Sequence, residues 1–301
     1  MNAFASASRR TPSIVVVGSV NLDLAASVSR LPVPGETVSG AELRRFPGGK
    51  GANQALAARR LGANVHLVAR VGRDAEADAA LALLRAEGVD LSQCLRHESL
   101  PTGVAMIAIA PEGENLIVVA PGANRALRPE TLELPDADAL MCQLEVPADT
   151  LCLACKKFSG FFCVNLAPAM HVPEEILQRA DLVIVNETEE AFYGDALRSC
   201  RGLIAVTRGS SKATLSKQQQ TVAKAKPPRV TPVDTTGAGD TFAAALTIAL
   251  LEGAPPQEAL EFACAAGALA TTKPGAQPSM PHRAEVDALR RNQATRPNRT
   301  L

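Results

Sequence analysis

The residues with the clearest chemical character are Gly237-Ala238-Gly239-Asp240, which open an apolar helical segment that ends at Leu251. Small residues at the start of a helix leave the free backbone N–H groups unobstructed, and such groups bind phosphate oxygens or developing negative charge. A carboxylate placed there would repel a bound phosphate, but it can accept a proton from an attacking hydroxyl group. This pattern indicates phosphoryl transfer with Asp240 as the base. The alternative is a glycine-rich turn in which Asp240 only caps the helix.

A second glycine-rich stretch, Gly48-Gly49-Lys50-Gly51, also opens a predicted helix, at 51–61. Its glycines let the backbone approach a ligand closely, and Lys50 and Asn53 supply donors for hydroxyl oxygens. It is not a P-loop, because Gly51 follows Lys50 where that motif requires Ser or Thr. The stretch therefore indicates a site for a hydroxylated ligand.

Asn21 and Asp23 come directly after the apolar run 14–20, which is typical of a buried strand. Open α/β sheets bind ligands beyond the carboxyl ends of their strands, and alternate residues of an extended segment face the same way. We expect both side chains to face one crevice, where a carboxylate can accept from two sugar hydroxyls. The alternative is an Asx turn that ends the strand.

The elements that must position these residues alternate between strands and helices. Apolar runs typical of strands recur at 65–69, 139–144, 162–165, 182–185 and 203–206, with helical patterns at 51–61 and 75–87. Such alternation predicts βαβ units and a mainly parallel sheet covered by helices.

Two stretches break this alternation, and we expect them to form a small β lid. Its strands are predicted within about 30–47 and 102–120, the second as a hairpin. An apolar lid has a face to bury, so it can cover a site or pair with another subunit. The predicted kinase domain spans 14–291, with flexible tails at 1–13 and 292–301.

Composition argues against nucleic acid and membrane partners. Lys plus Arg equals Asp plus Glu, at 31 each, and aromatic residues make up 3% of the chain. There is thus no global positive field and little material for base stacking. No apolar run approaches the length of a membrane span.

The seven cysteines are scattered, and most lie in apolar surroundings. Cys152 and Cys155 have the C-x-x-C spacing of redox and metal sites, but no second pair or paired His follows. We expect structural thiols and a cytoplasmic location.

Together, the Gly-Gly-Lys-Gly-Ala-Asn stretch at 48–53 and Asp-Thr-Thr-Gly-Ala-Gly-Asp at 234–240 resemble the two signature regions of the ribokinase family of carbohydrate kinases. The resemblance runs over nearly the whole chain, from 17–23 to 275–279. It implies a doubly wound α/β fold with helices on both faces of the sheet, and a β lid often shared across a homodimer. The implied reaction is ATP-dependent phosphorylation of D-ribose at its 5-hydroxyl, giving D-ribose 5-phosphate.

The resemblance also implies roles for individual residues. Asp240 is the implied base and Gly237, Ala238 and Gly239 the implied anion hole. The residues implied to bind the sugar are Asn21, Asp23, Gly49, Lys50, Asn53, Glu145 and Asp240. Those implied at the ATP site are Asn186, Thr207, Gly209, Ser210, Lys212, Gly239, Asp240 and Cys264.

Two cations are implied as well. Glu189 would organise the hydrated Mg²⁺ that accompanies ATP, and K⁺ would act as a monovalent activator. The implied potassium loop comprises Asp234, Thr236, Ala270, Lys273, Gly275 and Ser279. The chain departs from the family pattern in having Lys212 where a glycine is usual, and a shorter segment at 190–202.

Three alternatives stay open. The first is a kinase with another acceptor: another pentose, a ketohexose or a nucleoside. The few aromatic residues disfavour a nucleoside, whose base needs stacking walls. The second is a non-catalytic sugar or nucleotide sensor, against which the presence of Asp240 argues. Some other Rossmann-like enzyme would leave the two glycine-rich stretches unexplained.

Overall fold

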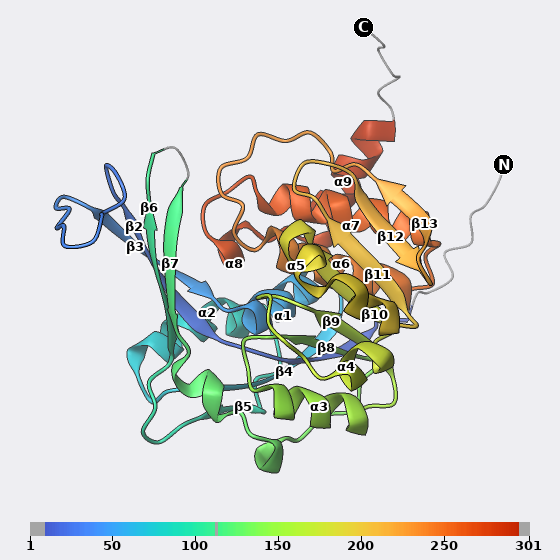
Figure 1. The fold of residues 1–301 in the computed structure, drawn as a ribbon, viewed down its shortest axis with the longest axis horizontal. Helices are drawn as coiled ribbons and strands as arrows, with labels where there is room; N and C mark the ends of the chain where they lie inside the picture. Colours follow the sequence, from blue (N-terminus) through green and yellow to red (C-terminus); the bar gives the residue numbers. More distant parts are fainter. Residues whose placement is uncertain (1–9, 112–113, 295–301) are drawn as a thin grey trace, which may run out of the picture.

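The computed structural model describes residues 10–111 and 114–294, and its main feature is a nine-stranded sheet (Figure 1). In spatial order the strands are β13 (Gln220–Ala225), β12 (Ala213–Lys217), β11 (Leu203–Thr207), β10 (Leu182–Asn186), β9 (Phe161–Asn165), β8 (Ala139–Gln143), β1 (Ser13–Val17), β4 (Asn64–Val71) and β5 (Cys94–Arg96). Pairing is parallel from β11 to β5, and antiparallel at β11–β12 and β12–β13.

Helices cover both faces of this sheet because its central strands are apolar on both sides. Ile14 and Val16 of β1 belong to one buried cluster, and Val15 and Val17 belong to another. The first cluster is covered by α1 (Lys50–Arg60), α2 (Ala75–Ala86), α6 (Ala238–Leu251), α7 (Pro256–Ala270) and α9 (Arg283–Ala294). The second is covered by α3 (Ala148–Lys157), α4 (Glu174–Arg179) and α5 (Glu187–Tyr193), followed by the 3₁₀ turn η3 (Gly194–Ser199). The predicted fold class is confirmed.

A second, four-stranded sheet projects from the main body and forms the lid (Figure 1). Its strands lie in the order β3 (Glu42–Gly48), β2 (Asn21–Ser27), β6 (Gly103–Ile109) and β7 (Asn115–Ala120). The predicted lid ranges were incomplete, because β2 lies outside them. The polar residues Asn21 and Asp23 hid this strand in the sequence, whereas pairing with β3 and β6 makes it central to the sheet.

The structured region also extends beyond the predicted limits of 14–291. Pro12 accepts a hydrogen bond from Asn64 N through its carbonyl, β1 begins at Ser13, and α9 continues to Ala294. Backbone hydrogen bonding therefore continues into parts of the chain predicted as tails. The remaining tail residues, 1–9 and 295–301, lie outside the described residues. Within the described ranges, no helix is both long and apolar enough to cross a membrane.

Candidate active site

Asp240 is fixed in the first turn of α6, which begins at Ala238 after the left-handed residue Gly237 (φ 78°). The Asp240 side chain is buried, and each of its carboxylate oxygens accepts one amide hydrogen bond. Asn53 Nδ2 donates to Oδ2 at 2.9 Å, and Gln54 Nε2 donates to Oδ1 at 3.1 Å. Both donors lie on α1, so the start of one helix holds the carboxylate at the start of another.

Lys50 lies among four acidic side chains that the fold gathers from different elements. Burial lowers the pKa of Lys50, but the charges of Asp240, Glu145, Glu189 and Asp23 outweigh that effect and raise it overall. Burial also raises the pKa of Asp240, and the Lys50 charge with the two amide hydrogen bonds offsets only part of the rise. The site therefore pairs a protonated amine with a carboxylate that holds its proton more readily than an exposed aspartate does.

The link between β1 and β2 contacts the start of α1 directly, and Glu145 connects the two. Glu145 Oε2 accepts from Ser19 Oγ at 2.5 Å and from Lys50 N at 3.0 Å, while Ser19 O accepts from Ala52 N at 2.8 Å. A Cβ atom on Gly51 would lie 2.5 Å from Gly18 C and Ser19 N. Glycine is therefore required at position 51, because only a residue without a side chain permits this approach.

Asn21 and Asp23 lie on β2 at the base of the lid, two residues apart and on the same face of the strand. The Asn21 carbonyl oxygen Oδ1 accepts from Asn124 Nδ2 at 2.8 Å, and Asn124 Oδ1 accepts from Val20 N at 2.9 Å. Because its oxygen is bound, Asn21 is left with its N–H groups as the donors for a ligand. Burial, followed by the charges of acidic neighbours, raises the pKa of Asp23 to about 7.

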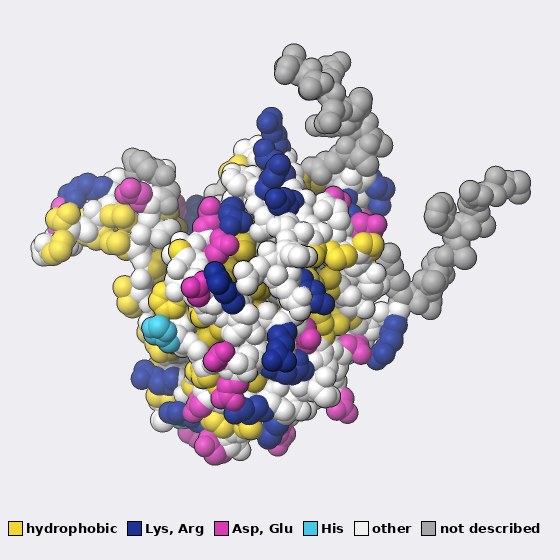
Figure 2. All heavy atoms as spheres, turned by 45° about the vertical axis from the view of Figure 1, so that its right-hand side comes forward, with side chains coloured by type: hydrophobic (Ala, Val, Ile, Leu, Met, Phe, Trp, Pro, Cys, Tyr) yellow, Lys and Arg dark blue, Asp and Glu magenta, His cyan; other side chains and the backbone are white. Residues whose placement is uncertain are grey.

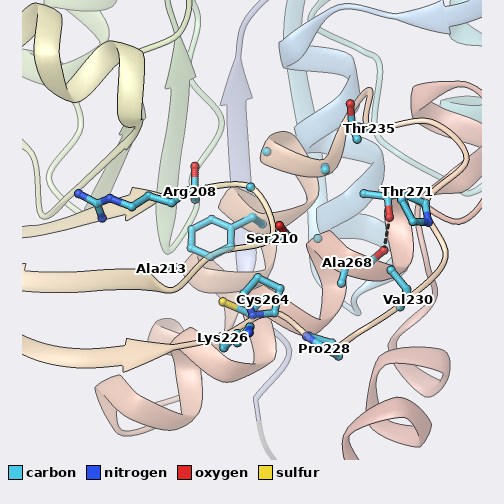
Figure 3. A pocket seen from close by; sticks show the side chains of 18 of the residues that line it. Arg208, Ser210, Ala213, Lys226, Pro228, Val230, Thr235, Cys264, Ala268 and Thr271 are labelled. Carbon is cyan, nitrogen blue, oxygen red and sulfur yellow. Dashed lines mark hydrogen bonds between the residues drawn. The ribbon is translucent and has the colours of Figure 1, made fainter. Parts of the chain in front are cut away.

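A cavity of about 700 Å³ lies beside the start of α6 (Figure 3). Its wall comes from the loop after β11, the segment 226–232, and the helices α6 and α7. Of the residues predicted at the ATP site, those that line it are Thr207, Gly209, Ser210, Gly239 and Cys264. Much of the remaining wall is apolar, including Phe242, Pro228 and Val230, as is usual for small-molecule sites.

Asn186, Lys212 and Asp240 are not among the residues that line this cavity. Asn186 instead begins α5: its Oδ1 accepts from Glu189 N at 2.9 Å, and Glu189 Oε2 accepts from Asn186 N at 2.8 Å. Lys212 is exposed, and its backbone does not have the positive φ that would favour glycine. The loop after β11 therefore accepts a lysine at position 212 without strain.

The predicted potassium segments meet at Asp234. Its Oδ1 accepts from Thr236 N at 2.9 Å, and its Oδ2 accepts from Gly275 N at 2.8 Å. Burial raises the pKa of Asp234, but a hydrogen bond from Thr236 Oγ1 at 2.6 Å, together with these two backbone hydrogen bonds, outweighs burial and lowers it overall. Ser279, four residues after Gly275, is buried, and its Oγ donates to Ala276 O at 2.8 Å. The Lys273 side chain instead extends to Glu285 at the surface.

Cys152 and Cys155 show no sign of reactivity. Both lie on α3 as free thiols, and Cys155 Sγ donates to Cys152 O at 3.2 Å. Burial raises the pKa of each thiol, which disfavours the reactive thiolate. These observations favour the structural interpretation.

Sequence reasoning assigned no role to several polar residues that the structure places around the site. They are Ser19, Gln54, Asn124, Gln143 and Asn165. One signal was available for two of them: Gln143 and Asn165 are polar residues that end the apolar strands β8 and β9. Carboxyl ends of parallel strands are where such sheets bind ligands.

Comparison with known proteins gives one consistent result. The model of the pfkB family of carbohydrate kinases matches residues 11–283. A ribokinase from Bacillus subtilis is 39% identical, with 92% of this chain and 99% of the relative aligned.

Solved structures agree. The ribokinase from Thermotoga maritima has a TM-score of 0.86 at 35% identity, covering 93% of this chain and 100% of its own. The Arabidopsis thaliana ribokinase complexed with ribose and ATP has a TM-score of 0.83 at 31% identity, covering 93% and 98%. With its buried aspartate at a glycine-rich helix start and a family match over most of its length, the chain belongs to the pfkB family of carbohydrate kinases.

Proposed function

We propose that this protein transfers the γ-phosphoryl group of ATP to the 5-hydroxyl of D-ribose, giving D-ribose 5-phosphate and ADP. The observation that carries the proposal is the position of Asp240. Its buried carboxylate lies in the first turn of α6, close enough to Asp23 and Lys50 to interact with their charges. Its neighbours Ala238 and Gly239 line the cavity. A base in this position lies between acceptor and donor.

In the proposed reaction, Asp240 accepts the proton of the sugar hydroxyl as its oxygen attacks the γ-phosphorus. The bond from phosphorus to the β–γ bridging oxygen breaks, and ADP leaves with the electron pair. Charge that develops on the phosphoryl oxygens is stabilised by backbone N–H groups at the start of α6. Gly239 and Asp240 precede the first helical hydrogen bond, Thr241 N to Gly237 O, whereas Ala238 N already donates to Thr235 O at 3.3 Å. We therefore assign a larger share of the anion hole to Gly239 N and Asp240 N than the sequence suggested.

The proposed sugar-binding residues are Asn21, Asp23, Gly49, Lys50, Asn53, Glu145 and Asp240. Asn53 supports this assignment most directly: its Nδ2 is used on Asp240, while its buried Oδ1 has no hydrogen-bond partner within the described residues. A buried carbonyl oxygen without a partner is costly, and a sugar hydroxyl that donates to Oδ1 would remove that cost.

The proposed ATP-binding residues are Asn186, Thr207, Gly209, Ser210, Lys212, Gly239, Asp240 and Cys264, supported by the five of them that line the cavity. Mg²⁺ bound to the ATP phosphates would neutralise part of their charge. Glu189 suits an outer role toward that ion, because it is buried near Lys50 and Asp240 and its pKa is raised by burial. It would act through water rather than as a direct ligand.

K⁺ is proposed at the loop of Asp234, Thr236, Ala270, Lys273, Gly275 and Ser279. The support is the Asp234–Gly275 hydrogen bond, which joins the two segments that would supply oxygen atoms. An ion there would neutralise Asp234 and fix the turn that begins α6. For Lys273 only the backbone carbonyl would take part, since its ammonium group lies 3.8 Å from Glu285.

A cytoplasmic homodimer that pairs through the lid is also proposed. Apolar side chains are exposed on the lid, among them Met106, Leu116, Ile117, Val118 and Val119. Figure 2 shows apolar side chains gathered on the projecting lid at the upper left. Such a surface is typical of one that a second subunit covers.

The deciding experiment measures ADP formation with ATP and a panel of D-ribose, another pentose, D-fructose and adenosine. We expect D-ribose to give the highest kcat/KM, with ³¹P and ¹³C NMR placing the new phosphate on C5. Asp240→Asn should lower kcat by roughly 10²- to 10⁴-fold and leave ribose binding nearly unchanged. A preference for another acceptor would overturn the substrate, and near-normal turnover in Asp240→Asn would remove Asp240 from its role.

A further inference from the structure

A chain of side-chain amides extends from the centre of the large sheet to Asp240. Gln143 lies at the end of β8 and donates from Nε2 to Gln54 Oε1 at 2.6 Å. Gln54 lies on α1 and donates from Nε2 to Asp240 Oδ1 at 3.1 Å. Both glutamines are fully buried.

The amide of Gln54 is held in one orientation by its partners. Its oxygen faces the Gln143 donor, and its nitrogen also donates to Asn165 Oδ1 at 3.2 Å. Asn165 is itself oriented, because its Nδ2 donates to Ile184 O at 3.2 Å. If the Gln54 amide were flipped, its oxygen would face two other oxygens, Asp240 Oδ1 and Asn165 Oδ1, neither of which is an N–H donor. The network therefore directs an N–H group at the carboxylate.

We propose that Gln54 and Gln143 form a positioning relay, in which Gln143 orients the Gln54 amide so that it holds Asp240 in the geometry for proton abstraction. Asn53 holds the other carboxylate oxygen from the same helix, so the plane of the carboxylate is fixed by two donors. This inference rests on the proposed role of Asp240 as the base. Neither glutamine is placed at the substrate; both act through Asp240.

The charges around Asp240 explain why a neutral amide serves here. Lys50 on α1 faces it with a positive charge, while Glu145 after β8, Asp23 on β2 and Glu189 on α5 face it with negative ones. A second buried acid beside Asp240 would add repulsion, and an apolar residue would leave Oδ1 without a donor. An oriented amide stabilises the ionised carboxylate without adding charge.

The network also leaves one buried oxygen atom without a hydrogen bond, which lowers stability and argues against a purely structural role. Gln143 Oε1 is buried and has no hydrogen-bond partner within the described ranges. Packing alone would be served as well by an apolar side chain of the same length, which carries no such cost. The Nε2 donation to Gln54 is the function that an apolar residue cannot replace.

The test uses Gln54→Met and Gln143→Met, which keep the length of the side chain and remove its amide. Gln54→Met should lower kcat by on the order of 10- to 100-fold, the range for losing a hydrogen bond to a charged group. Gln143→Met should lower it by about 3- to 10-fold, because it removes a hydrogen bond between two neutral amides. The KM for ribose should change less than about threefold, and the acid limb of the kcat/KM profile should move to higher pH. Thr247→Val is the matched control, because it removes a buried hydroxyl from α6, two turns beyond Asp240. It should leave kcat and the pH profile unchanged.

Double variants separate the relay from general damage. In an Asp240→Asn background, Gln54→Met should lower turnover less than about twofold further, because the group it positions is already gone. Gln54→Met combined with Gln143→Met should be no worse than Gln54→Met alone. Equal factors in both backgrounds, or independent losses from the two glutamines, would overturn the relay.

The relay and the proposed function fail in different ways. Near-normal turnover in Asp240→Asn refutes the base, whereas an inactive Asp240→Asn with fully active Gln54→Met and Gln143→Met refutes the relay alone. If Gln54→Met does not fold, as judged by circular dichroism, Gln143→Met still decides the question. It leaves Gln54 in place and removes only the donor that orients it.

Discussion

Ribose binding should weaken as pH falls through 7, and Asp23 is the cause. This carboxylate is buried at the base of the lid, and burial, then Glu145 and Asp240, raise its pKa to about 7. In the proposed site Asp23 accepts hydrogen bonds from sugar hydroxyls, which only the ionised form does with both oxygens. The sugar-bound state therefore prefers the ionised carboxylate, and lowering the pH opposes binding.

The size of the pH effect on ribose binding follows from the pKa of Asp23. With a value of about 7, roughly 90% of the free protein has Asp23 ionised at pH 8 and roughly 10% at pH 6. The apparent Kd for ribose should therefore rise about tenfold from pH 8 to pH 6, or about 1.4 kcal/mol of binding free energy. At pH 6, where roughly 90% of the free protein has Asp23 protonated, each sugar bound should release close to one proton.

Isothermal titration calorimetry at constant ionic strength measures both quantities. Titrations at pH 6, 7 and 8 give the apparent Kd, and buffers with different ionisation enthalpies give the number of protons released. Asp23→Asn is the control: it should bind ribose about 10- to 100-fold more weakly at pH 8 and show a flat profile. Asp240→Asn removes one charge that raises the Asp23 pKa, so its profile should shift to lower pH.

A wild-type Kd that changes less than twofold between pH 6 and pH 8 would refute this reasoning. It would mean that the Lys50 charge, which lowers the Asp23 pKa, outweighs burial in the free protein. Ribose binding by Asp23→Asn that still depends on pH would also contradict it, because the proton released would then come from another group.

Three further predictions concern other parts of the protein. Gly51→Ala should destabilise the fold by about 1–3 kcal/mol in urea unfolding, because its Cβ would meet backbone 2.5 Å away; Gly239→Ala, with open space around it, should not. Turnover should be faster in potassium chloride than in sodium or tetramethylammonium chloride at equal ionic strength, and equal rates would exclude the cation site. Lys212→Gly should change the KM for ATP only a few-fold, since Lys212 is exposed and unstrained; a collapse of ATP binding would make it a phosphate ligand.

The fold class was accessible from the sequence because its signals are local. Apolar runs such as Ile14–Val17 and Leu182–Val185 are buried strands, and alternation with helical segments implies a parallel sheet. The two glycine-rich stretches were equally visible, since each opens a helix. β2 was missed because Asn21 and Asp23 interrupt its apolar pattern, and because its parallel partner β6 is distant in the chain, with Asn21 opposite Gly103.

The surroundings of Asp240 were inaccessible for the same reason. Gln54 and Asp240 are 186 residues apart, and Gln143 lies 89 residues from Gln54. No spacing rule connects positions so distant, because only the folded chain brings β8 and α6 to the same helix, α1. The contact between Asn186 and Glu189, in contrast, is local. The two residues are three positions apart, which is the spacing of a capping box, and the structure contains that capping box.

The separation of the two sheets has a consequence for how the enzyme can diversify. Side chains proposed to recognise the acceptor, such as Asn21 and Asp23, lie on the lid sheet, whereas the cavity proposed for ATP is lined by the loop after β11, the segment 226–232, α6 and α7. The start of α6 belongs to both, because Asp240 is a proposed sugar-binding residue and Gly239 lines the cavity. Substitutions in the lid can thus alter the choice of acceptor while the donor site and the reaction stay intact, which makes the lid strands the natural target for engineering new sugar kinases.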